Sequence, residues 1–445
     1  MRNETSFWLG AAAITVMFAI LVGFGASGAA VIFLAILGTV AFAGIGWMVR
    51  RPGDASWLPN VLVIGFIVKL AGTVARYYMV TTLYGAGDAF RYYRVGIDLA
   101  AEWRSGQVPG LRGVGSLGTQ VVEAITGAMF AVFPPDMLGG FLVFAVIAYM
   151  GQVLLYAAFR RWAQPHQLKP YAILIFLLPT YAFWPSAIGK DAIVLLGLGA
   201  AAYFVARSLQ EFQVRWLIAL AFPLVLLGFI RVHIAGLVVG AMVVATLIAK
   251  LPARPAPGIR LRRIFVMVGA LFAAVLVITV APDILGVDIT STQDREGFVA
   301  DVVRRTSERG TVAEGGAVAT PWEVPGAVAH VLFRPFPWEA SSIQHYVAAA
   351  ETAVIAFLTF WKFPAIIRNL RRWRSNGYVV FSTVYVLGFA ILFSTVRNLG
   401  IIARQRGQVL AFFLCFVIAL GWEQKKRKQP NAQLPVLSYS GETDL

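Results

Sequence analysis

The sequence predicts an all-α integral membrane protein, a polytopic bundle of about 12 transmembrane helices. Three observations lead to this prediction. Hydrophobic residues make up 59% of the 445-residue chain and charged residues only 13%, against about 25% charged residues in a soluble domain. Apolar runs of about 20 residues, the length that crosses a bilayer, recur along the chain. Basic residues gather in the short segments between these runs, as they do in the cytoplasmic loops of membrane proteins.

The predicted spans together form a single domain over residues 1–445. They lie near residues 7–25, 28–49, 59–80, 137–159, 170–187, 191–207, 215–231, 233–250, 264–285, 346–364, 377–396 and 401–422. The first run could be a cleaved signal peptide. However, Glu4 precedes it and a second run follows almost at once, which favours a retained helix.

The distribution of charge predicts how the spans are oriented. If the N-terminus is cytoplasmic and each run crosses once, the cytoplasmic loops carry Arg50–Arg51, Arg160–Arg161, Lys169, Arg207, Arg215, Lys250 through Arg263, Lys362 through Arg374, and the basic tail 423–445. The two long outer loops, 81–136 and 286–345, hold more acids than arginines. This positive-inside pattern predicts a multi-pass inner (cytoplasmic) membrane protein with both termini in the cytoplasm.

Several function classes are excluded by the same composition. The net charge is +16, but the basic residues lie in short loops between apolar runs, so we expect no nucleic-acid binding. The single cysteine, Cys415, and four scattered histidines exclude a disulfide framework and a zinc motif. No cofactor is required by any motif, although a divalent metal held by carboxylates remains possible.

The first outer loop contains the densest group of charged residues. Apolar residues recur at helical spacing from Phe90 to Trp103, and a second apolar segment, Thr119–Phe133, follows a glycine-rich break. The pattern predicts two juxtamembrane amphipathic helices. Asp88, Arg91 and Arg94 place a carboxylate and two guanidinium groups beside the bilayer, where they could bind a lipid-linked phosphate and activate a hydroxyl. The alternative is that the two helices only cap the bundle.

Further polar residues fall at the predicted outer ends of other spans. Lys190 and Asp191 begin the sixth span, where Asp191 could bind substrate or simply stabilise the helix N-terminus. Arg231 and His233 lie in a tight hairpin between two apolar helices. His233 is a candidate acid or base, and Arg231 a candidate ligand, unless its side chain only snorkels to the surface.

Arginines also gather before the last span and at the end of the second outer loop. Arg397, Arg404 and Arg406 are candidate ligands for a pyrophosphate, because guanidinium groups bind phosphate in a bidentate manner. In a continuous helix Arg397 and Arg404 share a face while Arg404 and Arg406 point apart, unless the helix is broken there. Arg334 and Glu339, in FRPFPWE, either contact an acceptor sugar or belong to a lid at the interface.

The order of these parts resembles the polyprenyl-phosphate-dependent membrane glycosyltransferases of the GT-C type. The segments GDAFRYY, LAAEWRSGQVP and LGTQVVEAITGAMFAVF match the family's acidic first outer loop and its two juxtamembrane helices, and LLPTYAFWPSAIGKDAIVLLGLGAAAYFVAR resembles its middle helices. The resemblance covers roughly residues 60–250 and implies that Asp88 is the catalytic carboxylate. Two departures are that the loop follows the third span rather than the first, and that Ala89 replaces the second acid of the usual pair. The arginine-rich outer ends resemble O-antigen-type polysaccharide polymerases and ligases.

The two resemblances imply a glycosyltransferase that moves a sugar or oligosaccharide from a polyprenyl-(pyro)phosphate donor to a glycan or lipid acceptor on the extracytoplasmic face, in contact with membrane lipids. One alternative is a transporter or flippase of lipid-linked saccharide. We expect such proteins to place polar residues at the bilayer midplane, whereas the predicted spans look largely free of charge there. The second alternative is a non-catalytic scaffold of an envelope assembly complex.

Overall fold

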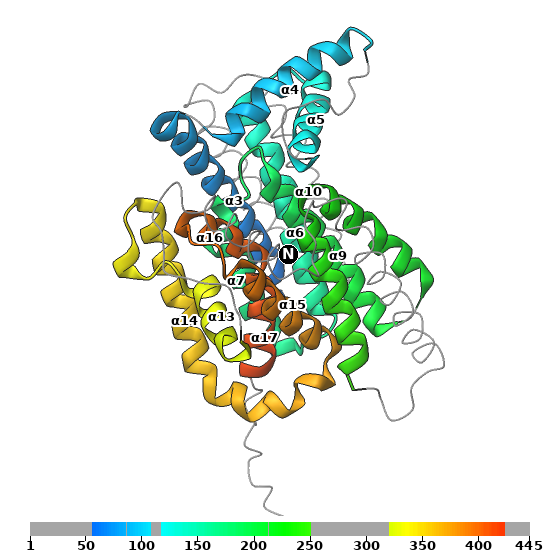
Figure 1. The fold of residues 1–445 in the computed structure, drawn as a ribbon, viewed down its shortest axis with the longest axis vertical. Coiled ribbons are helices and arrows are strands. Elements are labelled where there is room, and N and C mark those ends of the chain that lie inside the picture. Colours follow the sequence, from blue (N-terminus) through cyan, green and yellow to red (C-terminus); the bar gives the residue numbers. More distant parts are fainter. Residues whose placement is uncertain (1–55, 86, 108–116, 212, 251–319, 423–445) are drawn as a thin grey trace, which may run out of the picture.

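Every regular element in the described part of the chain is a helix (Figure 1). The computed structural model describes residues 56–85, 87–107, 117–211, 213–250 and 320–422. Its α-helices are α3 (Leu58–Tyr78), α4 (Asp88–Arg104), α5 (Leu117–Val132), α6 (Met137–Arg160), α7 (Pro165–Leu177), α8 (Pro179–Phe183), α9 (Lys190–Gln210), α10 (Val214–Ile248), α13 (Val324–Phe333), α14 (Ile343–Asn369), α15 (Gly377–Phe393), α16 (Leu399–Gln405) and α17 (Leu410–Gly421). A π-helix (Met79–Tyr84) continues α3, and 3₁₀ turns follow α14 (Leu370–Ser375) and α16 (Arg406–Gln408).

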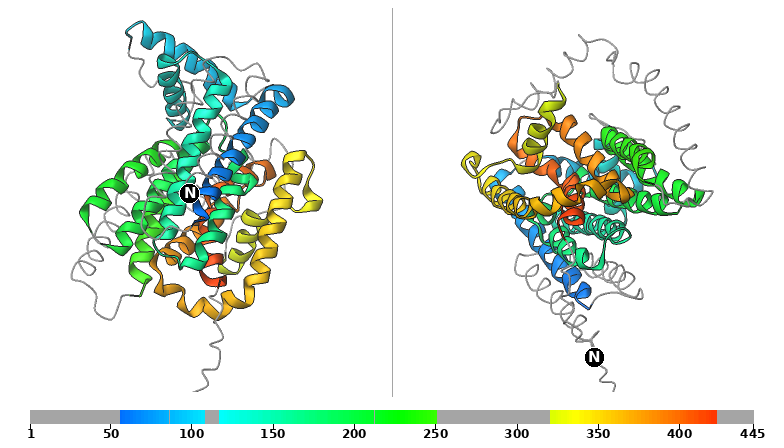
Figure 2. Two further views of the ribbon diagram at one scale, coloured as in Figure 1. Left: turned by 180° about the vertical axis from the view of Figure 1, so that it is seen from behind. Right: turned by 90° about the horizontal axis from the view of Figure 1, so that it is seen from below.

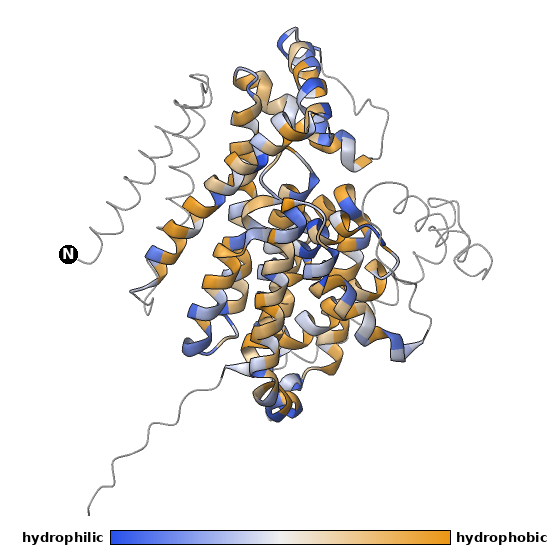
Figure 3. Ribbon diagram, turned by 90° about the vertical axis from the view of Figure 1, so that its left-hand side faces the viewer, coloured by the Kyte–Doolittle hydropathy of each residue, from blue (hydrophilic) through white to orange (hydrophobic). Residues whose placement is uncertain are grey.

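Five helical segments within the described residues are long and apolar enough to cross a membrane, or six if one bent pair forms a single span. They are Leu58–Tyr84, Met137–Arg160, Lys190–Gln210, Val214–Ile248 and Ile343–Ser375, with the pair Leu399–Gln408 and Leu410–Gly421 bent by 59°. Figure 3 shows hydrophobic residues along the bundle helices. The chain is therefore a helical protein suited to a membrane. The prediction of about 12 spans is not confirmed, and three of the predicted runs (7–25, 28–49 and 264–285) lie outside the described residues.

The centre of the bundle is built by α6 and α9, which pack directly on each other (Figure 2). Their backbones come close at two glycines, because a Cβ at Gly151 would meet the backbone of Leu195 and one at Gly199 the backbone of Gly151. Small residues let membrane helices approach in this way, so that van der Waals packing holds them together. On the two sides, α3 and α10 complete the inner layer.

Helix α10 doubles back on itself at Arg231. This residue has non-helical φ and ψ angles of −152° and 84°. Both ends of α10 lie at one end of the bundle, since Gln210, just before it, donates to the carbonyl of Arg161 at 3.2 Å and the carbonyl of Ile248 accepts from Arg374 at 3.0 Å. The hairpin predicted between 215–231 and 233–250 is thus present, and its turn lies at the opposite end from these contacts.

The segment predicted as one span at 170–187 is broken. Leu178 is extended (φ −65°, ψ 134°) and separates α7 from the short α8, which begins at Pro179. The backbone after the break is satisfied by Lys69, which lies midway along α3, is buried, and donates to the carbonyl of Tyr181 at 2.7 Å. Pro179 has no N–H to donate to a helical hydrogen bond, and a proline disfavours the helical conformation in the residue before it. The break therefore falls at Leu178.

The two helices predicted in the first outer loop are confirmed as α4 and α5, which project together from one end of the bundle (Figure 1). Arg91 on α4 pairs with the buried Glu123 on α5 at 2.9 Å. Tyr93 and Phe130 pack edge to face with their ring centroids 5.5 Å apart. The beginning of α5 rests on the bend of α10, because a Cβ at Gly118 would lie 2.6 Å from the carbonyl oxygen of Ile230. Residues 108–116 between the helices lie outside the described residues.

Candidate functional site

Charged residues from five separate elements meet below α4. The end of α3 supplies Arg76, the start of α4 supplies Asp88, the start of α9 supplies Asp191, the bend of α10 supplies Arg231, and α16 supplies Arg404. We refer to these five residues as the Asp191 cluster. Four of them, Asp88, Asp191, Arg231 and Arg404, were predicted as site residues from four different segments of the sequence, and the fold brings those four together.

Asp191 is the centre of the cluster. One carboxylate oxygen, Oδ1, lies 2.9 Å from Nη2 of Arg231, and the other, Oδ2, accepts a hydrogen bond from Nε of Arg404. Arg231 also donates to Oε1 of Gln405. The side chains of Asp191 and Arg231 are each only 11% exposed. Asp191 is therefore engaged mainly as the counter-ion of two arginines, and α9 is capped instead by Gly189 without a side-chain bond.

Asp88 is the accessible carboxylate of the cluster. It is the first residue of α4, and the chain turns into this helix through Gly85 (φ 61°) and Gly87 (φ 133°), backbone angles that favour glycine. Its side chain is 69% exposed, and Oδ2 lies 3.9 Å from Nη1 of Arg404. At this distance the pair is weak in solvent. Asp88 is thus available to bind or deprotonate another molecule.

A cavity of about 260 Å³ opens between Asp88 and the arginines. Its lining includes Arg76, Asp88, Asp191, Arg404 and Trp184. The guanidinium of Arg76 lies 5.0 Å from the ring centroids of both Phe183 and Trp184, which hold it by cation–π contact. Nε of Arg76 is buried and has no hydrogen-bond partner. The cavity thus offers two guanidinium groups, one of which has unused hydrogen-bonding capacity.

Sequence reasoning missed Arg76 although a signal was present. It lies in the last turn of α3, inside a predicted span. An ionisable residue in a membrane segment is expensive to bury and is by default a candidate for function.

Two further residues border the cluster. Lys190, predicted as a ligand, is half-buried at the start of α9 and interacts electrostatically with Asp88, Asp191, Arg231 and Arg404. Tyr92 is buried against Gly189. Burial, together with the neighbouring Asp88, raises the pKa of Tyr92 to about 12. Its hydroxyl therefore stays protonated at neutral pH, and it is hydrogen-bonded to the side chain of Thr119 on α5.

An apolar cavity of about 410 Å³ adjoins the polar one. It lies between α3, the α7–α8 break and the first turns of α14, and its lining includes Gly72, Met79, Phe183 and Val347. Trp184 lines both cavities. A molecule with a phosphate and a hydrocarbon chain could therefore place the phosphate beside Arg76 and the chain between α3 and α14.

Arg406, another predicted ligand, belongs to a separate buried cluster. It is 0% exposed, with Nη2 3.6 Å from Oε1 of Glu351, and it donates to the carbonyl of Arg334 at 3.0 Å. The other oxygen of Glu351 accepts the backbone N–H of Thr180 at 2.6 Å. This group connects α8, α14 and the turn after α16, so its contacts are structural. Glu351 lies in a predicted span, which again was the available signal.

The bent segment before α17 explains why Arg404 and Arg406 take part in different clusters. Helix α16 ends at Gln405, and a 3₁₀ turn follows at Arg406–Gln408. Arg404 then reaches Asp191, while Arg406 reaches Glu351. The sequence predicted that these two side chains point apart in a continuous helix, and the structure separates them in spite of the break.

The remaining predicted residues make other contacts. Arg334 pairs with Glu339 at 2.8 Å, and Arg91 pairs with Glu123. Arg94 is exposed on α4, Arg397 is half-buried just before α16, and His233 packs its ring 5.7 Å from that of Phe393. We therefore centre the candidate site on the Asp191 cluster. Among the described residues no group of three or more histidine, cysteine, aspartate or glutamate side chains could hold a metal ion.

No family model, curated protein or solved structure matches the chain.

Proposed function

We propose that the protein is a membrane glycosyltransferase that uses a polyprenyl-(pyro)phosphate-linked sugar as donor and a glycan or lipid as acceptor on the extracytoplasmic face. The observation that carries the proposal is the shared cavity of Asp88, Arg76 and Arg404. An exposed carboxylate and two guanidinium groups converge there from distant parts of the chain, next to an apolar slot.

The proposed reaction assigns a role to each group. Arg76 and Arg404 bind the phosphate of the donor, and they stabilise the negative charge that develops on it as the bond from the sugar C1 to the phosphate oxygen breaks. The acceptor hydroxyl attacks C1 and forms the new glycosidic bond. Asp88 accepts the proton of that hydroxyl. The carrier phosphate leaves with the bonding electron pair.

The apolar cavity beside Trp184 would hold the first isoprene units of the carrier. Burial of hydrocarbon stabilises such binding by roughly 25 cal/mol per Å². Gly72 on α3 and Val347 on α14 line this cavity, and both helices are candidate membrane spans. A lipid could therefore enter from the side, with its phosphate stopping at Arg76.

The proposal can be tested in cells that lack the chromosomal copy of the gene. We expect the wild-type gene to restore the missing envelope glycan, and Asp88→Asn and Arg404→Ala to lower transfer by about a hundredfold or more. Asp98→Asn is a matched control, because Asp98 is an exposed carboxylate on the same helix α4. Glycan analysis of the envelope measures the outcome. Full complementation by Asp88→Asn at normal protein levels would contradict the role of Asp88.

One observation favours the alternative of a transporter or flippase of lipid-linked saccharide. Contrary to the expectation from the sequence, membrane-suited helices of the bundle do contain buried charges: Lys69 in α3 and Glu351 in α14 are 1% and 4% exposed. They satisfy the backbone around the broken α7–α8 segment. Transporters typically build their substrate sites from broken helices of this kind.

The two functions differ in where the lipid-linked sugar accumulates. Without the transferase, the donor should collect in the outer leaflet, where an enzyme added outside the cell can cleave it. Without a flippase, it should collect in the inner leaflet and be protected until the cells are opened. If the lipid-linked sugar accumulates in the inner leaflet, the transferase proposal is wrong and the transporter takes its place.

A further inference from the structure

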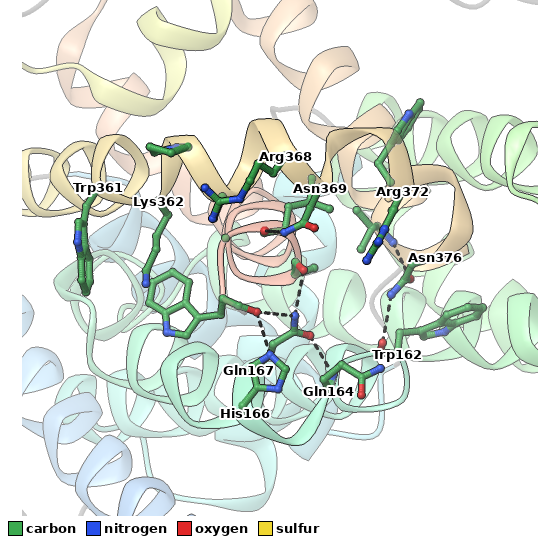
Figure 4. A pocket seen from close by; sticks show the side chains of 18 residues that line it. Trp162, Gln164, His166, Gln167, Trp361, Lys362, Arg368, Asn369, Arg372 and Asn376 are labelled. Atoms are coloured by element: carbon green, nitrogen blue, oxygen red, sulfur yellow. Dashed lines mark hydrogen bonds between the residues drawn. The ribbon is translucent and has the colours of Figure 1, made fainter. Parts of the chain in front are cut away.

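A second polar cavity, of about 1050 Å³, is lined by the residues drawn in Figure 4. The helix ends that form it lie at the opposite end of the bundle from α4 and α5 (Figure 1). Beyond Pro364, α14 and its 3₁₀ turn run across this end of the molecule, as Figure 1 shows. The cavity lies between this crossing segment, the turn from α6 to α7, and the end of α17.

The lining of this cavity is strongly basic. It includes Lys362, Arg368 and Arg372 and, within the described part of the chain, no carboxylate. Four of the five amide and imidazole side chains that also line it are bonded to backbone carbonyls, among them Asn376, which donates to the carbonyl of Trp162 at 3.1 Å. Gln167 donates to Ala419 at 3.0 Å, Asn369 donates to Leu420 at 2.9 Å, and His166 lies 2.9 Å from the carbonyl oxygen of Trp422. These bonds hold the polar side chains of the lining in place. The cations are therefore the charged groups that the cavity offers to a ligand.

Tryptophans frame the cavity and hold one of its cations. The ammonium of Lys362 lies 4.0 Å from the ring centroid of Trp361 and 4.4 Å from that of Trp422. Trp162 and Trp373 also line the cavity. Tryptophan is enriched where a protein crosses the membrane–water interface, since its ring is apolar and its N–H is polar. Four indoles around one basic cavity therefore indicate a position at the level of lipid headgroups.

The outer face of α14 supports the same position. Phe357, Phe360, Trp361 and Ile367, which recur at helical spacing, are between 51% and 74% exposed. Such a stripe on a candidate membrane span faces hydrocarbon. Trp361 belongs to both the stripe and the cavity lining. The cavity thus borders the edge of the bilayer, where the nearest anions are the phosphates of phospholipids.

We propose that this cavity binds the headgroup of an anionic phospholipid, with its phosphate beside Arg368 and Arg372 and its acyl chains along the apolar face of α14. The site would tie the segment that follows Pro364 to the bundle. The three cations of the lining would attract a headgroup with net negative charge more strongly than a neutral one, so the selection is by headgroup charge. The inference does not depend on the proposed transferase activity.

Native mass spectrometry of the purified full-length protein, delipidated and titrated with phosphatidylglycerol or phosphatidylcholine, tests this site. Each basic residue near a headgroup contributes enough attraction that losing two should weaken binding about thirtyfold. We therefore expect Arg368→Gln with Arg372→Gln to lose one tightly bound phosphatidylglycerol, and phosphatidylcholine to bind weakly to all variants. Arg371→Gln is the matched control, because it removes an exposed charge from the same segment outside the cavity lining.

The remaining outcomes either support the site or overturn it. Arg368→Lys with Arg372→Lys keeps the charge and should retain most of the binding, which separates loss of charge from loss of fold. Equal retention of phosphatidylglycerol in the double glutamine variant and in Arg371→Gln would overturn the proposal. Full displacement of phosphatidylglycerol by inorganic phosphate would also overturn it, because the cavity would then recognise a free anion rather than a lipid.

Discussion

Asp191 holds together two arginines that lie 40 and 213 residues away in the sequence. Its two carboxylate oxygens are divided between them, one for Arg231 and one for Arg404. Asp88, by contrast, is mostly exposed and only loosely paired. The two acids of the cluster therefore differ in kind, because Asp191 is the buried counter-ion of two arginines and Asp88 is the exposed carboxylate that the proposed reaction uses.

This difference predicts that two matched substitutions affect different properties, the stability of the protein for Asp191 and the proposed transfer for Asp88. Asp191→Asn leaves two guanidinium groups with no full counter-charge in a mostly buried site, and we expect it to lower the free energy of unfolding by about 3–5 kcal/mol. Asp88→Asn should change it by less than about 1 kcal/mol, while it lowers the proposed transfer by about a hundredfold or more. Thermal unfolding of both variants in detergent, followed by intrinsic fluorescence, makes the comparison. Equal destabilisation by the two substitutions would contradict the division of roles.

The buried pair of Arg406 and Glu351 gives a second prediction at the scale of single residues. Glu351→Gln keeps an acceptor for the N–H of Thr180 but removes the counter-ion of a fully buried arginine. We expect a loss of about 3–5 kcal/mol of stability. Adding Arg406→Leu should recover part of that loss, since the uncompensated charge is gone. The same unfolding measurement checks both variants, and no recovery in the double variant would show that Arg406 does not depend on Glu351.

At the scale of elements, the bend of α10 determines whether the cluster can form. Arg231 reaches Asp191 from a residue with non-helical angles, and the start of α5 rests on the preceding residue, Ile230. Helices α5 and α10 touch here with no room for a side chain on Gly118. Helix α5 therefore supports the site through its contact with α10.

A substitution at this contact should disturb the site without removing any of its charges. Gly118→Ala places a Cβ 2.6 Å from the carbonyl oxygen of Ile230, so we expect α5 or the bend to shift and transfer to fall by about tenfold, as small displacements do in positioned sites. Gly228→Ala is the control, because that position of α10 has open space and alanine favours helix there. The ratio of transfer rates in the two variants is the measurement, and equal rates would contradict the contact.

The sequence could predict elements and the residues at their ends, but not all of their partners. Apolar length and helical spacing identified α6, α9 and the pair α4–α5, because these properties are local. Charges placed at predicted outer ends identified Asp88, Asp191, Arg231 and Arg404. The partnership of Arg406 with Glu351, and the place of Arg76 beside Trp184, depend on how helices far apart in the sequence pack. Local pattern contains no information on that packing.

At the scale of the whole molecule, the bundle has two chemically distinct ends. One end carries the Asp191 cluster beneath α4 and α5. The other carries Arg160, Arg207, Arg368 and Arg374, which belong to helix ends and turns predicted to be cytoplasmic. By the positive-inside rule the end with more basic residues faces the cytoplasm. The Asp191 cluster would then face outward, which is the side where a polyprenyl-linked donor is used by enzymes of the proposed class.

Cysteine labelling can establish this orientation, because the single cysteine, Cys415, is buried and can be replaced by alanine. We expect Ser105→Cys, exposed at the end of α4, to react with a membrane-impermeant maleimide in intact cells. Ser375→Cys, exposed after α14, should react only after the membrane is permeabilised. Gel-shift detection of the labelled protein distinguishes the two. The reverse pattern would place the Asp191 cluster in the cytoplasm and exclude an extracytoplasmic transferase, and labelling of both sites from outside would show that the two ends do not lie on opposite sides of the membrane.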